Sequence, residues 1–222
     1  MNWTKSANIK LTEYLDTHNL SKGIGTKESA CSIAAINLAL NGTLKDDVPE
    51  CMSEAIGEWI IRIQDQFPNN LRNSMEWKSL LPLAAGTGRE KETERLNLIR
   101  KWIWETVLPP LNPAVSNLKL FPKWESMLDK KNSKWIEVVY SAAHNKSRDD
   151  HAPESIRGIA FDVKNIATYL TLALDDKCPV DEASGFFGSV FYYATDIANS
   201  YSNYDYWNEV DCCGLLEKMI KI

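Results

Sequence analysis

The most hydrophobic stretch of the chain is the segment 28–42, ESACSIAAINLALNG, whose interior holds only one serine and one asparagine among apolar side chains. A helix that is apolar on every side belongs in the interior of a domain. The segment is too short to cross a bilayer, which needs about 20 apolar residues. Thr26 is a suitable N-cap, and Asn41-Gly42 supplies the left-handed residue at which helices commonly stop. We therefore predict a buried central helix over about residues 28–40.

Asn37 places an amide inside this apolar segment. A buried amide needs hydrogen-bond partners, so we expect its side chain to bond a neighbouring helix or the end of a loop. This interpretation gives Asn37 a structural role and leaves catalysis as the alternative.

Apolar residues recur at helical spacing along most of the remaining chain, as in Ile56, Ile60, Ile63 and Phe67. No stretch shows a convincing alternation of apolar and polar residues, which a half-buried strand would need. Helices are expected in the segments 6–18, 53–67, 74–85, 87–108, 122–128, 134–144, 153–174, 179–197 and 215–222. The chain is predicted to form a single, irregular all-α domain over residues 1–222, with a weak division near 111–122 as the alternative.

Residues at the predicted helix starts support this reading. Ser53 is a suitable N-cap for the helix that follows it, and Asn73 with Glu76 forms the first and fourth positions of a capping box. Pro153 and Pro179 suit the first turns of the two longest helices, because proline is well tolerated there.

Composition and charge narrow the classes of function. The chain has 222 residues and a formal net charge of −5, whereas sequence-independent binding to nucleic acid or anionic lipid requires a basic face. No run of about 18 apolar residues predicts a membrane span, and the N-terminal segment has no apolar signal-peptide core. Five cysteines without regular spacing are typical of a reduced protein. We expect a cytoplasmic protein with no membrane partner and no nucleic-acid partner.

The segment Gly86-Thr87-Gly88-Arg89 has two interpretations. Glycines and an arginine at a helix N-terminus are typical of a phosphate site, although the spacing matches neither the P-loop nor the dinucleotide fingerprint. Thr87 and Glu90 also form a capping box at the start of the next helix. We predict that Thr87 is an N-cap, and the alternative is a ligand site formed by Arg72, Thr87 and Arg89.

Metal-ligating residue types are concentrated in one polar segment, at His144, Asp149, Asp150 and His151. Imidazole and carboxylate groups suit zinc or iron, but the spacing matches no known metal motif. We expect a solvated loop here, and we predict no metal and no other cofactor.

Aromatic residues are abundant, with eight Trp and eight Tyr in the chain. The polar segment SYSNYDYWNE contains Tyr201, Tyr204, Tyr206 and Trp207. Exposed aromatic clusters are typical of interfaces, and a loop folded over the hydrophobic body explains the segment equally well. We predict that these four residues form a surface that contacts another protein or a second copy of the chain.

Four stretches of the first half form a familiar pattern: ACSIAAINLALNG at 30–42, CMSEAIGEWIIRIQD at 51–65, RNS at 72–74 with LLPLAAGTGREKETERL at 80–96, and WIWETVLPPL at 102–111. Together they resemble an uncharacterised family of helical proteins encoded by bacteria and phages. The resemblance implies an all-helical fold and a bacterial or phage origin. That family has no established activity, so the resemblance implies no functional residues.

These observations favour a non-enzymatic helical protein that acts through protein–protein contacts, as a bacterial or phage accessory protein. The alternative is a small-molecule or phosphate-binding protein, or an enzyme, with a pocket near Arg72 and Arg89. A polar pocket with convergent charged groups would favour the alternative, and an exposed aromatic patch would favour protein–protein contacts.

Overall fold

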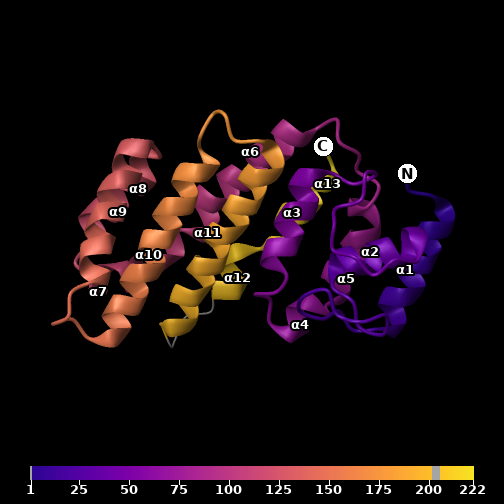
Figure 1. Cartoon of the computed structure of the whole chain (residues 1–222), viewed down its shortest axis with the longest axis horizontal. Helices are drawn as coiled ribbons and strands as arrows, with labels where there is room; N and C mark the ends of the chain where they lie inside the picture. Colours follow the sequence, from indigo (N-terminus) through magenta and orange to yellow (C-terminus); the bar gives the residue numbers. More distant parts are fainter. Residues whose placement is uncertain (1, 202–205) are drawn as a thin grey trace. The chain divides into compact units, whose positions relative to one another are not determined.

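The computed structural model describes residues 2–201 and 206–222. Within these residues the regular structure is entirely helical (Figure 1), and the single pair of β-bridged residues, Gly25 and Ala30, forms no strand. The prediction of an all-α fold is therefore confirmed. The chain divides into two compact units, Met1–Leu98 with Cys212–Ile222, and Ile99–Asp211. The boundary lies within a helix and not near residues 111–122.

The first unit is built around the predicted apolar helix. Its helices are α1 (Lys5–Thr17), α2 (Ser32–Asn41), α3 (Glu54–Ile63), α4 (Asn69–Arg72), α5 (Met75–Ala84), the first part of α6 (Glu92–Trp102) and α13 (Cys212–Ile220). Helix α2 packs against α1, α3 and α5, and α13 packs on α5. Seven of the ten residues of α2 are buried, and the helix ends at Gly42, whose φ is +77°. The central position and the predicted end of this helix are correct.

The start of α2 differs from the prediction. The backbone before it forms a tight turn in which Thr26 and Ser29 exchange hydrogen bonds of 3.0 and 3.2 Å. The hydroxyl of Tyr14, on α1, accepts a hydrogen bond of 2.8 Å from the backbone N–H of Ala30. Cys31, not Thr26, is the N-cap. Since a contact from α1 fixes this backbone, local sequence could not show where the helix begins.

Several buried polar groups of the first unit find hydrogen-bond partners inside it. The N–H and hydroxyl of Ser32 both donate to Oε1 of Gln64, at 3.1 and 2.9 Å, and the indole N–H of Trp77 donates to the Ser32 oxygen at 3.1 Å. The Asn37 side-chain nitrogen donates to two backbone carbonyls of the loop 43–52, at 3.0 and 2.8 Å. The expectation that Asn37 bonds a neighbouring loop is confirmed.

The two predicted helix starts of this unit have different outcomes. Ser53 is the N-cap of α3, as expected. The capping box of Asn73 and Glu76 is wrong, because Ser74 is the N-cap of α5. Asn73 instead bonds both backbone groups of Leu20, with distances of 2.6 Å to its nitrogen and 3.3 Å to its oxygen. This side chain therefore ties the loop after α1 to the start of α5.

The second unit begins with the end of α6 and continues as η1 (Ile103–Val107, a π-helical segment), η2 (Pro109–Leu111), α7 (Asn112–Asn117), α8 (Phe121–Lys130), α9 (Ser133–Ser147), α10 (Glu154–Ala173), α11 (Val180–Ser200) and α12 (Tyr206–Val210). Helix α10 packs on both α9 and α11 (Figure 1). Pro153 and Pro179 immediately precede α10 and α11, in agreement with their predicted role. Across the described ranges of the chain, no helix is long and apolar enough to cross a bilayer.

Candidate functional site

Arg72, one of the three predicted ligand-binding residues, lies in the interior of the first unit and is 4 % exposed. Its Nε donates to the carbonyl of Gln64 at 3.1 Å, and its Nη2 donates to the carbonyl of Phe67 at 2.6 Å. Both carbonyls follow the end of α3, where helical hydrogen bonds run out. Burial lowers the pKa of Arg72, and the charge of Asp65 opposes this shift. The guanidinium therefore fixes the connection from α3 to α4.

Thr87 joins the segment before α6 to the start of α3. Its hydroxyl donates to the carbonyl of Ala84 at 2.8 Å and accepts from the N–H of Ser53 at 3.1 Å. Helix α6 begins only at Glu92, so Thr87 is not its N-cap and the capping box with Glu90 is wrong. The prediction failed because the partner of the hydroxyl lies 34 positions away in the sequence.

Arg89 forms an ion pair with Glu54, in the first turn of α3. Arg72 bonds carbonyls beyond the other end of the same helix. Since α3 has ten residues, its two ends are about 15 Å apart. Arg72 and Arg89 therefore serve opposite ends of α3, and they do not converge on one anion.

Arg95, which the sequence analysis did not single out, holds the loop that contains Thr87. It is 2 % exposed, and its N–H groups donate to the carbonyls of Gly88, Thr87 and Met219 at 2.9, 3.1 and 3.1 Å. The carboxylate of Glu92 lies 3.6 Å from Arg95. In the sequence Arg95 follows a run of charged residues typical of a solvated helix face, which is why it was missed.

The predicted aromatic surface has a mixed outcome. Tyr204 lies outside the described residues, and Tyr201 is half-buried at the end of α11. Trp207 is also half-buried, with its ring edge-on to Phe191 at 5.8 Å. Tyr206 is 1 % exposed, and its hydroxyl donates to a carbonyl of η1 at 3.1 Å. Tyr206 is therefore a core residue of the second unit, and we remove it from the predicted contact surface.

The residues considered as metal ligands, His144, Asp149, Asp150 and His151, lie at the end of α9 and in the turn after it. Asp149 is paired with Lys146 at 2.9 Å. In the part of the chain that the structure describes, no group of three or more His, Cys, Asp or Glu side chains is arranged to hold a metal ion.

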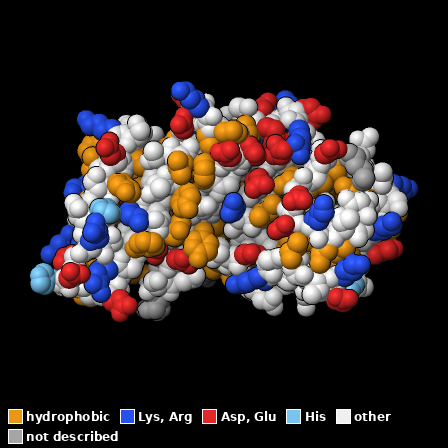
Figure 2. All heavy atoms as spheres, in the orientation of Figure 1, with side chains coloured by type: hydrophobic (Ala, Val, Ile, Leu, Met, Phe, Trp, Pro, Cys, Tyr) orange, Lys and Arg blue, Asp and Glu red, His pale blue; other side chains and the backbone are white. Residues whose placement is uncertain are grey.

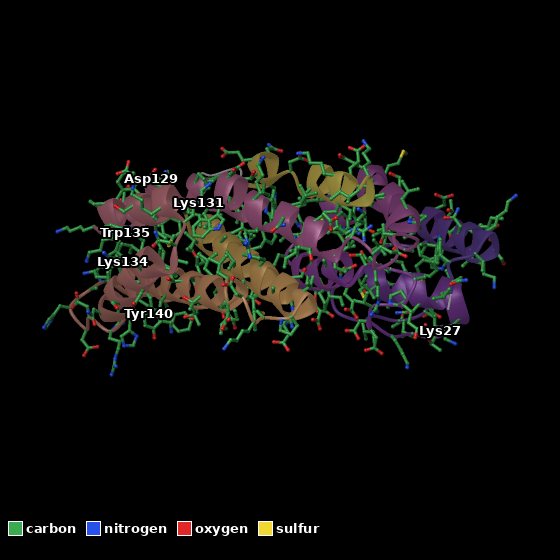
Figure 3. All side chains as sticks on the ribbon, turned by 90° about the horizontal axis from the view of Figure 1, so that it is seen from above. Lys27, Asp129, Lys131, Lys134, Trp135 and Tyr140 are labelled. Atoms are coloured by element: carbon green, nitrogen blue, oxygen red, sulfur yellow. The ribbon has the colours of Figure 1, made fainter. Side chains whose placement is uncertain are left out.

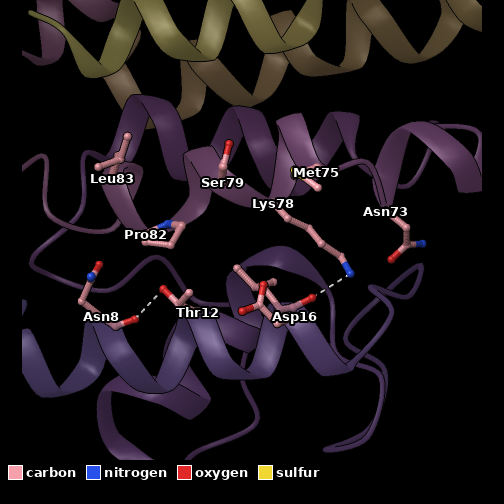
Figure 4. Close-up of a pocket in the computed structure, with 10 residues that line it drawn as sticks. Asn8, Thr12, Asp16, Asn73, Met75, Lys78, Ser79, Pro82 and Leu83 are labelled. Carbon is pink, nitrogen blue, oxygen red and sulfur yellow. Dashed lines mark hydrogen bonds between the residues drawn. The ribbon is translucent and has the colours of Figure 1, made fainter.

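An open cleft of about 550 Å³ lies between α1 and α5 of the first unit (Figure 4). Thr12 and Asp16 line it from α1, and Met75, Lys78 and Leu83 line it from α5. Figure 4 shows the Lys78 side chain extending from α5 towards the end of α1. The cleft thus combines a polar wall with two exposed apolar side chains, Met75 and Leu83.

The ammonium group of Lys78 is hydrogen-bonded within the protein. Its Nζ donates to the carbonyls of Leu15 and His18, both at 2.8 Å, and these carbonyls lie at the end of α1. Burial lowers the pKa of Lys78, and the charge of Asp16 opposes the shift. A cation at a helix C-terminus is favourable, so Lys78 closes α1 and also forms one wall of the cleft.

A second candidate site lies on the solvent side of the hairpin formed by α10 and α11. Phe161 and Leu172 on α10 are 49 % and 43 % exposed, and Tyr192 on α11 is 40 % exposed. Figure 2 shows hydrophobic side chains gathered in a column over α10 and α11. We define the hairpin face by these side chains and their half-buried neighbours: Phe161, Tyr169, Leu172, Phe186, Tyr192 and Tyr193.

The rings of the hairpin face contact one another across the two helices. Tyr169 on α10 stacks on Tyr193 of α11, with centroids 5.7 Å apart and planes at 19°. Tyr169 also lies 6.1 Å from Phe186, and Tyr193 meets Tyr192 at 5.1 Å with planes at 78°. Offset and edge-on pairs of this kind are stabilising by about 0.5–1.5 kcal/mol beyond area burial. Tyr169, Phe186, Tyr192 and Tyr193 therefore form one connected aromatic cluster within the hairpin face.

Two carboxyl groups lie beside these rings, Asp162 on α10 and Asp196 on α11. Burial, and secondly the charge of Asp196, raises the pKa of Asp162 to about 7. Burial also raises the pKa of Asp196, while a hydrogen bond from Tyr192 opposes that shift. No Lys or Arg contributes to either shift, so each charge is desolvated without a neutralising cation among the described residues.

The basic side chains of the second unit are concentrated elsewhere, on α8 and α9. Residues 119–148 contain seven Lys and Arg against three Asp and Glu. Figure 3 shows Lys131, Lys134, Trp135 and Tyr140 in this region, and Tyr140 stacks on His144 with centroids 5.9 Å apart. The chain is acidic overall, but this region has a local excess of basic side chains.

The hairpin face was missed at the level of the sequence, although a signal for it exists. When residues 180–200 are placed on a helix, the buried stripe includes Phe187 and Phe191, and Tyr192, Tyr193 and Phe186 lie off that stripe. Aromatic residues on the polar side of an amphipathic helix are the visible signal. The burial of the two carboxyl groups is not visible in the sequence, because it depends on how α10 and α11 pack.

Comparison of the chain with protein-family models, with curated proteins and with solved structures finds no match in any of the three.

Proposed function

We propose that the protein is a non-enzymatic binding protein whose hairpin face contacts another protein. The observation that carries this proposal is the connected ring cluster of Tyr169, Phe186, Tyr192 and Tyr193. On the same hairpin face Phe161, Leu172 and Tyr192 are exposed to solvent. Large contiguous apolar patches on a protein surface mark interaction sites. Tyrosine and phenylalanine are enriched in such interfaces, because they bury much area at a low cost in side-chain entropy.

The proposal keeps the function expected from the sequence and moves its location. The predicted aromatic segment packs partly into the core at Tyr206, whereas the hairpin face directs its rings outwards. We further propose that this contact takes place in the cytoplasm of a bacterium or phage-infected cell. Cys31, Cys51 and Cys178 form no disulfide bond, which agrees with a reducing compartment.

Site-specific photo-crosslinking tests the proposal. The photoreactive residue p-benzoyl-phenylalanine replaces Phe161 or Tyr192 in the full chain, which is produced in its natural host and irradiated. Exposed Ile9, on α1 of the first unit, is the control position. We expect a discrete covalent adduct from both hairpin positions and none from Ile9. Equal labelling from all three positions, or no adduct from the hairpin, would contradict the proposal.

The cleft between α1 and α5 supports a second candidate function, the binding of a small polar molecule. Its volume of about 550 Å³ is within the range of small-molecule sites, about 300–1,000 Å³. This candidate replaces the predicted pocket at Arg72 and Arg89, whose side chains serve opposite ends of α3. A thermal-shift screen of polar metabolites on the parent and on Asp16→Asn tests it. A stabilising compound whose effect the substitution removes would support this function.

A further inference from the structure

The carboxyl groups of the hairpin face lack a counter-ion of their own. Asp162 and Asp196 are close enough for the charge of one to act on the other, and no Lys or Arg of the described chain offsets them. Two desolvated carboxylates repel each other, so the ionised pair is unfavourable unless a proton or a cation neutralises it. The basic side chains of α8 and α9 show that the unit has cations, but they do not neutralise this pair.

The rings beside the carboxyl groups are suited to a cation as well. Tyr192 and Tyr193 meet almost at right angles. The Tyr192 hydroxyl hydrogen-bonds Asp196, and Tyr193 lies close enough to Asp162 for their charges to interact. An ammonium or guanidinium group is attracted to the face of an aromatic ring within about 6 Å. The face already contains one such contact, since the Lys164 ammonium lies 4.2 Å from the centroid of the Phe161 ring.

The same helix face contains a buried donor that has no acceptor. Asn165 follows Phe161 at i+4 and precedes Tyr169 at i+4, which places it on the same side of α10. Its side-chain nitrogen is buried and has no hydrogen-bond partner in the described part of the chain. A buried N–H without an acceptor is costly, so this side of α10 contains a polar group that the fold leaves unsatisfied.

This inference rests on the function proposed above. We propose that the hairpin face recognises a basic segment of its protein partner. An Arg or Lys side chain of that segment binds between the aromatic rings of Tyr192 and Tyr193 and the carboxyl groups of Asp162 and Asp196. The cation supplies the charge that the pair lacks. The neighbouring apolar side chains Phe161 and Leu172 cover the aliphatic part of the segment.

The test uses a fluorescein-labelled hexa-arginine peptide as the probe, and the matched hexa-citrulline peptide as an uncharged control of nearly the same shape. Binding to the full chain is measured by fluorescence anisotropy at pH 8 and physiological ionic strength. The double variant Asp162→Asn/Asp196→Asn removes both charges of the site. The control variant Asp129→Asn/Asp150→Asn removes the same charge from two exposed carboxylates of the second unit.

We expect hexa-arginine to bind the parent at least about tenfold more tightly than hexa-citrulline does. The site variant should lose about tenfold or more in affinity, and the control variant should stay within about twofold of the parent. Equal losses in the two variants would show only general attraction to an acidic protein and would overturn the proposal. Equal binding of the two peptides, or no binding of hexa-arginine, would also overturn it. Thermal melting of both variants verifies that they fold.

The cross-linking experiment separates failure of this inference from failure of the proposed function. If p-benzoyl-phenylalanine at Phe161 still captures the same protein when Asp162 and Asp196 are both asparagine, the hairpin face is an interface but does not select a cation. If the parent gives no adduct, both proposals fail. If mass spectrometry identifies the adduct as a dimer of this chain, the occupant is a second copy and the basic-segment proposal is overturned.

Discussion

The buried arginines of the first unit and the carboxyl pair of the second unit differ in how the fold satisfies them. In the first unit Arg95 donates to three carbonyls, Arg72 donates to two, and Ser32 shares Gln64 Oε1 between its N–H and hydroxyl. In the second unit Asp162 and Asp196 are desolvated and near each other without a neutralising cation. Buried polar groups are normally satisfied within a native structure. The fold therefore accounts for these groups of the first unit, whereas for the carboxyl pair of the second unit we propose a partner outside the fold.

The comparison also shows why local motifs were poor guides to function. Arg72 and Thr87 looked like ligand-binding residues, but the polar side-chain atoms of each are hydrogen-bonded to backbone groups of the same unit. Asp162 was not singled out in the sequence. A polar residue therefore indicates function when the fold leaves its charge or its hydrogen-bonding groups without a partner.

The largest effect is expected where the first unit is most apolar. Ile36 on α2 is completely buried, so Ile36→Asp places an unpaired charge in the core. We expect a loss of more than about 4 kcal/mol in the free energy of unfolding, measured by urea denaturation. Ile9→Asp on α1 is the control, because Ile9 is exposed and its replacement should change stability by less than about 0.5 kcal/mol. Similar midpoints for the two variants would contradict the central position of α2.

A smaller loss is expected from the arginine that joins α6 to the C-terminal helix. Arg95→Leu keeps an apolar stem but leaves the carbonyls of Gly88, Thr87 and Met219 without their donor. Because unsatisfied buried groups cost about 1–3 kcal/mol each and partly relax, we expect a total loss of about 3 kcal/mol. Arg89→Ala is the matched control, since its ion pair with Glu54 is exposed and contributes less than about 1 kcal/mol. If Arg95→Leu is as stable as the parent, the hydrogen bonds of Arg95 do not stabilise the first unit.

The helices were largely predictable from the sequence, because their signals are local. The apolar run of α2, the glycine that ends it and the prolines before α10 and α11 all act within a few residues. The errors at Thr26, Asn73 and Thr87 have one cause, namely that distant segments supply the hydrogen bonds that fix these residues. The candidate site was not predictable in the same way, because the burial of Asp162 and Asp196 exists only when α10 and α11 are packed together.

The carboxyl pair predicts a dependence of stability on pH. The folded-state pKa of Asp162 is about 7, above its ordinary value of 3.8, so the folded protein binds more protons than the unfolded chain between these values. Stability from this group is therefore present at pH 4 and is lost as the pH rises to about 7. Asp196 acts in the same direction, and Tyr193 is the other titratable group coupled to Asp162.

Replacing Asp162 with asparagine should remove this penalty. At pH 8 the melting temperature of Asp162→Asn should exceed that of the parent by about 2–4 °C for each 1 kcal/mol of relief. At pH 4 the two proteins should melt together, because the parent carboxyl is then protonated. Asp150→Asn, at an exposed position, should match the parent at both values. A variant that is less stable than the parent at pH 8 would show that the carboxylate has a stabilising partner.

The most direct test of the central claim compares two tyrosines of the second unit, Tyr192 on the hairpin face and Tyr206 in the core. Tyr206→Ala should cost about 3–5 kcal/mol, because its ring is fully buried and its hydroxyl bonds a carbonyl of η1. Tyr192→Ala should change the free energy of unfolding by less than about 1 kcal/mol, because its side chain is 40 % exposed. The same Tyr192→Ala protein should lose the adduct that p-benzoyl-phenylalanine forms at Phe161. If Tyr192→Ala instead destabilises as much as Tyr206→Ala and leaves the adduct intact, the hairpin face is part of the core and not a binding surface.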